Sequence, residues 1–155
     1  LIWIMGPVDY LWAQYGAVFH NIEVEDLAIA TLRFKNGAFG SIQASTALYP
    51  GFPTRLELYG TNGAAILEGE MLQLLHIKGE EPYSEKEVKE GLGTWARPDA
   101  APALNHAASI RDFAQAILED REPKVPGEEG RRSIEVIKAI YQSGKTCEVV
   151  KFPLA

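Results

Sequence analysis

Two adjacent carboxylates, Glu25 and Asp26, are the side chains that most resemble a pair for acid–base chemistry. They stand at the predicted start of a strand, where neighbouring side chains point to opposite faces, so we interpret them as structural. The glycines of Gly60-Thr61-Asn62-Gly63 fall in a predicted hairpin and not at the start of a helix, where a dinucleotide phosphate would bind. The residue pattern alone therefore contains no complete catalytic constellation.

Metal and thiol chemistry are not indicated. The three histidines, His20, His76 and His106, are separated by 56 and 30 residues, and the chain has one cysteine, Cys147. This spacing does not match a zinc site. We interpret His20 and His76 as surface or core residues without a ligand, and Cys147 as a small buried residue of a strand.

The composition is that of one globular domain. The 155 residues include 15 Lys and Arg against 21 Asp and Glu, which gives a net charge of −6, and 46% are hydrophobic. The apolar content is too high for disorder, and the acidic balance argues against a nucleic-acid partner. The apolar run at residues 1–5 is far shorter than the ~20 residues of a membrane span and lacks the basic region of a signal peptide. We therefore predict no nucleic acid, no membrane and, by default, a cytoplasmic location.

Alternating apolar residues predict a series of strands in the first half of the chain. We expect strands over residues 8–19, 27–34, 38–45, 54–59, 64–67 and 71–77. Asn36-Gly37 predicts a tight hairpin between the second and the third of them. Several of these strands carry large apolar residues on both faces, so both faces of the sheet need a cover.

The period changes in the second half of the chain. Residues 78–105 show no period and are predicted to form a surface excursion. Helices are expected over 104–117, with His106 on the polar side, and over 128–143, ended by Gly144, before a last strand at 147–152. This order predicts an α+β fold: a large open, mostly antiparallel sheet with two main helices packed on one face. The other face is expected to pair with a second copy, giving a homo-oligomer.

The first residues are typical of the last turn of a helix. The apolar run at 1–5 is followed by Gly6-Pro7, a common helix stop. We expect residues 1–6 to be the tail of a truncated helix, and residues 1–155 to be a single domain cut from a longer chain. A mature start after processing is the alternative.

Several segments resemble, in order, the C-terminal domain of the Gfo/Idh/MocA oxidoreductases. The similarity covers essentially all 155 residues and rests on residues 24–30, 32–38, 44–46, 56–63, 112–113, 123, 127–133 and 139–143. The resemblance implies a missing N-terminal Rossmann domain that binds NAD or NADP. It also implies hydride transfer to or from a sugar, inositol or related polyol. In this family the general acid–base lysine and its Asp/His partners precede the position of Leu1. No catalytic, cofactor-binding or metal-binding residue is therefore expected in this chain, and the fragment alone is expected to be inactive and to bind no cofactor.

The resemblance also implies which residues meet the substrate. They are Tyr49 and Phe52 in a loop between strands, Trp95 and Arg97 in the excursion, and His106 at a helix start. Aromatic rings stack on sugar faces, Arg clamps a carboxylate, and imidazole both donates and accepts hydrogen bonds. The alternatives are buried rings that anchor loops, a solvated arginine and a solvent-exposed histidine.

A second function remains open at this level. A stand-alone, non-catalytic binding or scaffold module would have the same sheet and the same contact between copies. The two hypotheses differ in what they require upstream of Leu1. The enzyme requires a glycine-rich βαβ unit there, and the module does not.

Overall fold

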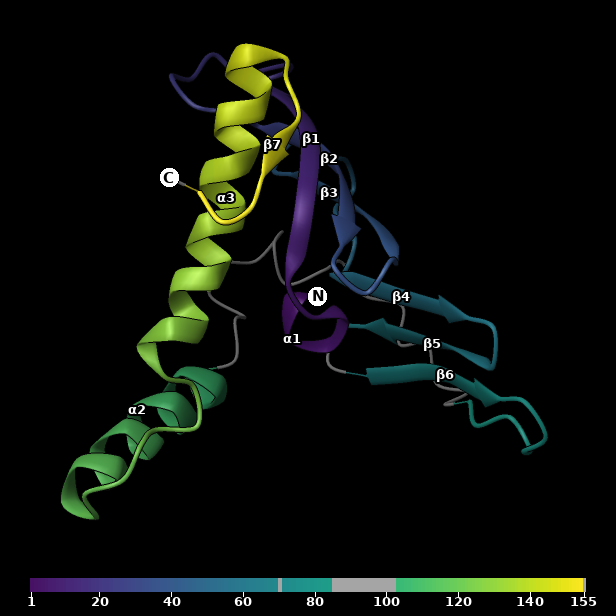
Figure 1. The fold of residues 1–155 in the computed structure, drawn as a ribbon, viewed down its shortest axis with the longest axis vertical. Coiled ribbons are helices and arrows are strands. Elements are labelled where there is room, and N and C mark those ends of the chain that lie inside the picture. The colour runs from purple at the N-terminus through teal and green to yellow at the C-terminus, as the bar shows by residue number, and fades with distance from the viewer. Residues whose placement is uncertain (70, 85–102, 155) are drawn as a thin grey trace. The chain divides into compact units, whose positions relative to one another are not determined.

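The structure of the chain is a computed structural model that describes residues 1–69, 71–84 and 103–154. The chain divides into two compact units, one formed by Leu1–Ala47 with Pro102–Ala155 and the other by Leu48–Ala101. Figure 1 labels the elements of both.

The first unit is built on a four-stranded antiparallel sheet. Its strands are β1 (Val8–Gly16), β2 (Leu27–Phe34), β3 (Phe39–Ser45) and β7 (Val150–Lys151), in the order β3-β2-β1-β7. The predicted hairpin between β2 and β3 is confirmed. Gly37 adopts a φ of 93°, and the Asn36 side chain accepts a hydrogen bond from the Ala38 N–H.

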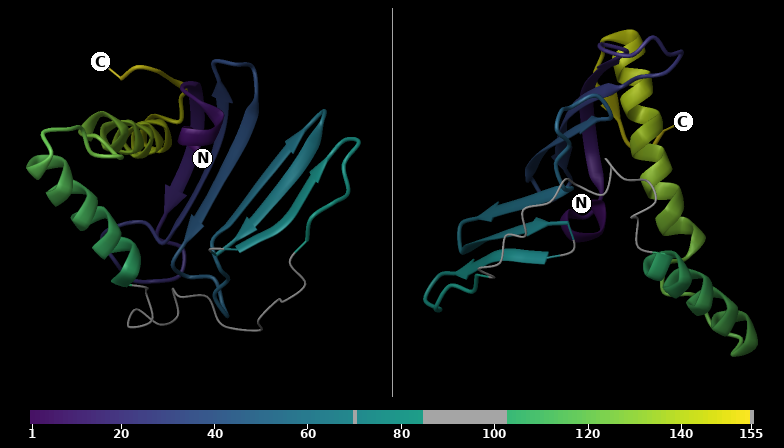
Figure 2. Two further views of the ribbon diagram at one scale, coloured as in Figure 1. Left: turned by 90° about the horizontal axis from the view of Figure 1, so that it is seen from below. Right: turned by 180° about the vertical axis from the view of Figure 1, so that it is seen from behind.

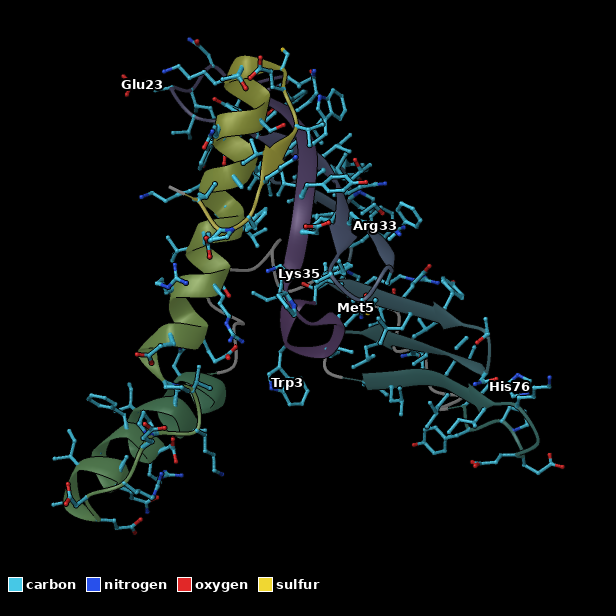
Figure 3. The ribbon with its side chains drawn as sticks, in the orientation of Figure 1. Trp3, Met5, Glu23, Arg33, Lys35 and His76 are labelled. Carbon is cyan, nitrogen blue, oxygen red and sulfur yellow. The ribbon has the colours of Figure 1, made fainter. Side chains whose placement is uncertain are left out.

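Three helices accompany this sheet: α1 (Ile2–Met5), α2 (Ala103–Leu118) and α3 (Gly127–Thr146). The short α1 ends at Gly6, which has a φ of 81°, as the Gly6-Pro7 pair predicts. The turn of the β2–β3 hairpin holds α1 in place, because the Asn36 amide donates to the Met5 carbonyl and the Lys35 N–H donates to the Pro7 carbonyl. Figure 3 labels Met5 and Lys35 at this junction.

The core lies between α3 and one face of the sheet. Figure 2 shows α3 against β1 and β7. The buried apolar residues are Val8, Leu11, Ala13, Ala30, Leu32, Phe34, Val136, Ala139 and Val150. Ser143 is fully buried beside them, where its hydroxyl accepts the Ala13 N–H at 2.9 Å and donates to the Glu148 carbonyl at 2.6 Å. This hydroxyl links α3, β1 and the segment that leads into β7.

The end of α3 differs from the prediction. Gly144 does not stop the helix, which continues to Thr146 and ends at Cys147. Gly144 instead makes room for the Tyr15 ring, since a Cβ atom there would lie 2.6 Å from Tyr15 Cε1. Cys147 adopts a left-handed conformation with a φ of 58° and is exposed, so its assignment to a buried strand was wrong. The last strand is correspondingly shorter and begins at Val150.

The second unit is a three-stranded antiparallel sheet. It contains β4 (Arg55–Gly60), β5 (Gly63–Glu68) and β6 (Met71–Ile77), in that order. Its register places the apolar residues Leu56, Leu58, Ala65, Leu67, Leu72 and Leu75 on one face. On the other face the Tyr59 hydroxyl and the Arg55 guanidinium both donate to Glu57. All three strands were predicted from the alternation of apolar residues.

The α+β class and the antiparallel pairing of the strands are confirmed. The strands belong to two sheets of four and three strands. Within the first unit α3 provides the packed helix, whereas most side chains described in α2 are exposed. β1 ends at Gly16 and not at Phe19, because the N–H groups of residues 18–20 bind a side chain instead of a neighbouring strand.

Gly144→Ala tests the packing of α3 against Tyr15. An alanine inside a helix normally stabilises it by about 0.5–1 kcal/mol relative to glycine. At Gly144 we expect the opposite, a loss of about 1–3 kcal/mol in the free energy of unfolding, because the methyl group overlaps the tyrosine ring. Gly130→Ala in the same helix, where nothing lies within 4 Å of the new methyl, is the matched control and should stabilise. Urea unfolding of both variants measures the difference, and equal effects would contradict this packing.

Candidate functional site

The face of the four-stranded sheet away from α3 presents a regular grid of side chains. We call it the open face and define it by three cross-strand rows: Tyr10, Arg33 and Phe39; Trp12, Thr31 and Ser41; Gln14, Ile29 and Gln43. Eight of the nine residues are exposed, and the Arg33 side chain is half-buried. Figure 3 labels Arg33 on this sheet.

Two contacts order the open face. The Arg33 guanidinium carbon lies 4.2 Å above the centre of the Phe39 ring, a cation–π contact between β2 and β3. The Thr31 hydroxyl donates to the Trp12 carbonyl at 3.5 Å. Aromatic rings, amides and hydroxyls on a flat sheet provide contact area and hydrogen bonds. The open face carries no carboxylate, imidazole or thiol in its grid, so it is suited to binding and not to proton transfer.

Asp26 organises the loop between β1 and β2. Its side chain is buried, and its two oxygens accept the backbone N–H groups of Val18, Phe19 and His20 at 2.7 to 2.9 Å. The His20 ring lies 3.2 Å from the same carboxylate. The backbone carbonyl of Asp26 accepts the Ser45 hydroxyl at 2.7 Å, which ties the end of β3 to the same point.

These hydrogen bonds hold the pKa of Asp26 far below its ordinary value, the N–H groups of Val18 and His20 contributing most. The carboxylate is therefore permanently charged near neutral pH and is unable to act as a proton donor. Its neighbour Glu25 accepts a 2.7 Å hydrogen bond from the Tyr141 hydroxyl, which raises the pKa of that tyrosine. The structural interpretation of Glu25 and Asp26 agrees with these contacts. His20 is exposed, and its ring is a partner of the Asp26 carboxylate.

The residues predicted to meet a substrate fall in different parts of the structure. Tyr49 and Phe52 belong to the second unit, between β3 and β4, and are exposed, Tyr49 to 94%. His106 belongs to the first unit and is the fourth residue of α2, also exposed. Trp95 and Arg97 lie outside the described residues. The structure thus places three of the five without testing their role.

The position of His106 on α2 differs from the expectation. It was assigned to the polar side of the helix, but spacings of four, three and four residues align it with Ile110, Phe113 and Ile117. These three apolar side chains are exposed. Sequence reasoning found the apolar spacing but took it as a core stripe, and so missed an exposed apolar face with a histidine at its N-terminal end.

Two further features bear on the class of site. Among the described residues no group of three or more His, Cys, Asp or Glu side chains is arranged to hold a metal ion. No helix in the described ranges is both long enough and apolar enough to cross a membrane.

Comparison with known proteins decides the family. A family described as "Oxidoreductase family, C-terminal alpha/beta domain", the Gfo/Idh/MocA C-terminal domain, matches residues 1–152. The chain belongs to this family. No curated protein matches the sequence.

Solved structures of oxidoreductases share the fold of this Gfo/Idh/MocA domain. The WlbA dehydrogenase from Bordetella pertussis, in complex with NADH and UDP-GlcNAcA, is 23% identical with a TM-score of 0.77, and the match covers 99% of this chain and 41% of that one. An oxidoreductase from Agrobacterium radiobacter, in complex with NAD+, L-tartaric acid and magnesium, is 21% identical with a TM-score of 0.79, covering 97% and 45%. Levoglucosan dehydrogenase, in complex with NADH and levoglucosan, is 18% identical with a TM-score of 0.77, covering 99% and 47%. The chain thus spans less than half the length of these neighbours.

Asp26→Asn tests the anchor of the β1–β2 loop. The amide replaces one acceptor oxygen with a donor, so at least one of the three N–H groups loses its partner, and we expect the melting temperature to fall by at least ~5 °C. Because the folded-state pKa is lowered, the contribution of the carboxylate is complete above its unfolded value of about 4 and is lost as pH falls below it. The difference in melting temperature between wild type and Asp26→Asn should therefore shrink below about pH 4. Glu25→Gln, which retains an acceptor for Tyr141, is the control and should change little. Thermal unfolding across this pH range is the measurement. Equal changes in melting temperature in Asp26→Asn and Glu25→Gln would contradict the anchor.

Proposed function

We propose that this chain is the substrate-binding and oligomerising C-terminal domain of an NAD(P)-dependent oxidoreductase that acts on a sugar, inositol or related polyol. The observation that carries the proposal is the family match over residues 1–152. The neighbours in complex with NADH and with UDP-GlcNAcA or levoglucosan support a nicotinamide cofactor and a sugar-like substrate. A Rossmann domain, absent from these residues, would hold NAD or NADP and supply the catalytic groups. A cytoplasmic location is the default part of this proposal.

The domain's share of the chemistry is to position the substrate. Tyr49 and Phe52 are exposed rings that can stack on the apolar face of a sugar and exclude water. His106 is an exposed imidazole that can both donate to and accept from a sugar hydroxyl. Trp95 and Arg97 complete the proposed set of substrate-binding residues. None of these residues is proposed to transfer a proton or hydride.

The open face is proposed to pair with the same face of a second copy. Its rows combine Trp12, Tyr10 and Ile29 with amide and hydroxyl groups. This composition is typical of a protein–protein interface and not of a surface that remains exposed to solvent. A sheet face that lies about a two-fold axis presents the same rows to its partner, so such a contact joins two copies within a homo-oligomer.

Variants of the substrate-binding residues test the proposed enzyme. In the full-length protein encoded by the gene, assayed with NAD and NADP on a panel of sugars and polyols, Tyr49→Ala and His106→Ala should each raise KM about tenfold with little change in kcat. This split is expected because the lost contacts bind substrate and transition state alike. Tyr59→Ala, which removes an exposed tyrosine from β4, is the matched control for Tyr49. Absence of turnover with every pair of cofactor and substrate in the panel would count against the proposal.

Substitution of Trp12 tests the proposed contact between copies. In the full-length protein Trp12→Ser should weaken self-association at least tenfold, because a tryptophan in the middle of a contact contributes heavily to affinity. Trp3→Ser removes a tryptophan from α1, outside the open face, that is 84% exposed against 39% for Trp12, and should leave self-association unchanged. Light scattering coupled to size exclusion over a dilution series gives the self-association constants of the wild type and of both variants. A monomeric wild type at micromolar concentration, or equal effects of the two variants, would argue against this contact.

A further inference from the structure

The dipeptide Asn-Gly occurs twice in the chain, and each copy lies at the tip of a hairpin. Asn36-Gly37 lies between β2 and β3, and Asn62-Gly63 lies where β4 turns into β5. Asparagine before glycine readily loses its side-chain amide, because glycine has no Cβ atom to keep its backbone nitrogen away from the asparagine Cγ atom. In a folded protein the reaction also requires an asparagine side chain that is able to rotate. The two copies differ in this respect.

The side chain of Asn36 is held by both of its polar atoms. Its Oδ1 atom accepts the Ala38 N–H at 3.0 Å, and its Nδ2 atom donates to the Met5 carbonyl at 3.0 Å. The amide has to break these hydrogen bonds before its Cγ atom is able to meet the Gly37 nitrogen. Asn36 is therefore protected, although the residue is exposed.

Asn62 is followed by the same residue but is not restrained in this way. The residue is exposed, and within the part of the chain that the structure describes its side chain makes no hydrogen bond. Its backbone carbonyl accepts the Lys78 N–H at 2.8 Å, so the main chain is fixed while the amide is able to rotate. Exposure also admits the water that completes the reaction.

We infer that Asn62 is a site of spontaneous modification, at which the asparagine converts to aspartate and isoaspartate. The Gly63 backbone nitrogen attacks the Asn62 Cγ atom and forms a C–N bond, and the side-chain amide leaves as ammonia with the proton of the Gly63 N–H. Water then opens the five-membered imide at one of its two carbonyls, without an oxidant, a reductant or a co-substrate. Opening at the backbone carbonyl gives isoaspartate, whose main chain runs through the former side chain and is one carbon longer. This inference is independent of the proposed function.

The hairpin has little room for a longer main chain at this point. A Cβ atom on Gly63 would overlap the His76 carbonyl, so β5 and β6 approach each other closely there. Gly63 also pairs with Gly60 in β4 and with Ile77 in β6. An extra carbon immediately before Gly63 disturbs both pairings, because register depends on a fixed two-residue period. Isoaspartate is therefore expected to open the tip of this sheet.

Peptide mapping of the full-length protein tests the inference. Trypsin places the two asparagines on separate peptides, 36–55 and 56–78. The folded protein is incubated near neutral pH, and mass spectrometry after digestion at mildly acidic pH follows the conversion of each amide to the acid. We expect Asn62 to convert at least about tenfold faster than Asn36, because the two hydrogen bonds of Asn36 have to break first.

The same protein unfolded in urea is the matched control. Both asparagines precede glycine, so in the unfolded chain they should convert at similar rates, and the comparison separates the effect of the fold from that of the sequence. Equal rates in the folded protein, or faster conversion of Asn36, would overturn the inference. Aspartate as the sole product at position 62 would also overturn it, because direct hydrolysis of the amide yields no isoaspartate.

Hydrogen–deuterium exchange tests the expected opening of the hairpin. Incubated protein enriched in isoaspartate is compared with Asn62→Asp, which carries the same charge on a main chain of ordinary length. We expect faster exchange at residues 60–65 and 75–78 in the isoaspartate form than in Asn62→Asp. Equal exchange in the two proteins would overturn the opening of the hairpin and leave the modification itself in place.

Discussion

The packing of α3 on one face of the four-stranded sheet is the constraint on which the rest of the first unit depends. The buried hydroxyl of Ser143 bonds β1 on one side and the segment before β7 on the other, and Gly144 lets the Tyr15 ring lie directly on the helix. A single helix covers a single face. The opposite face consequently remains exposed, and it is the surface through which the domain is proposed to meet a second copy.

A second constraint comes from one buried charge. Burial of a carboxylate is costly unless every oxygen has a partner, and Asp26 meets this condition with backbone N–H groups of its own loop. The loop is shaped by the carboxylate at the expense of strand pairing, which explains the early end of β1. The Asp26 carbonyl also accepts a hydrogen bond from the Ser45 hydroxyl. The end of β3 is therefore fixed at the same point, immediately before the chain passes into the second unit.

Much of this fold is predictable from local pattern, and the exceptions have identifiable causes. The alternation of apolar residues and the Asn36-Gly37 pair are local patterns that span a few residues. They predict six strands and one hairpin. Gly144 makes room for the ring of Tyr15, 129 residues away in sequence, and no local rule contains that contact. Helical periodicity identified the stripe of Ile110, Phe113 and Ile117, but periodicity does not reveal whether such a stripe meets this domain's own sheet or another domain. The proposed substrate-binding residues came from family resemblance, since their chemistry is too ordinary to stand out by type.

The central claim is that this domain works as part of a longer nicotinamide-dependent enzyme. The most direct measurement is to determine the coding sequence upstream of Leu1. The account predicts a βαβ unit with a glycine-rich turn, followed by a lysine in a Glu-Lys-Pro stretch and an Asp/His pair on the helix whose tail is expected at residues 1–6. A start codon close to Leu1, with none of these elements before it, would contradict the account and identify a module that works without a cofactor.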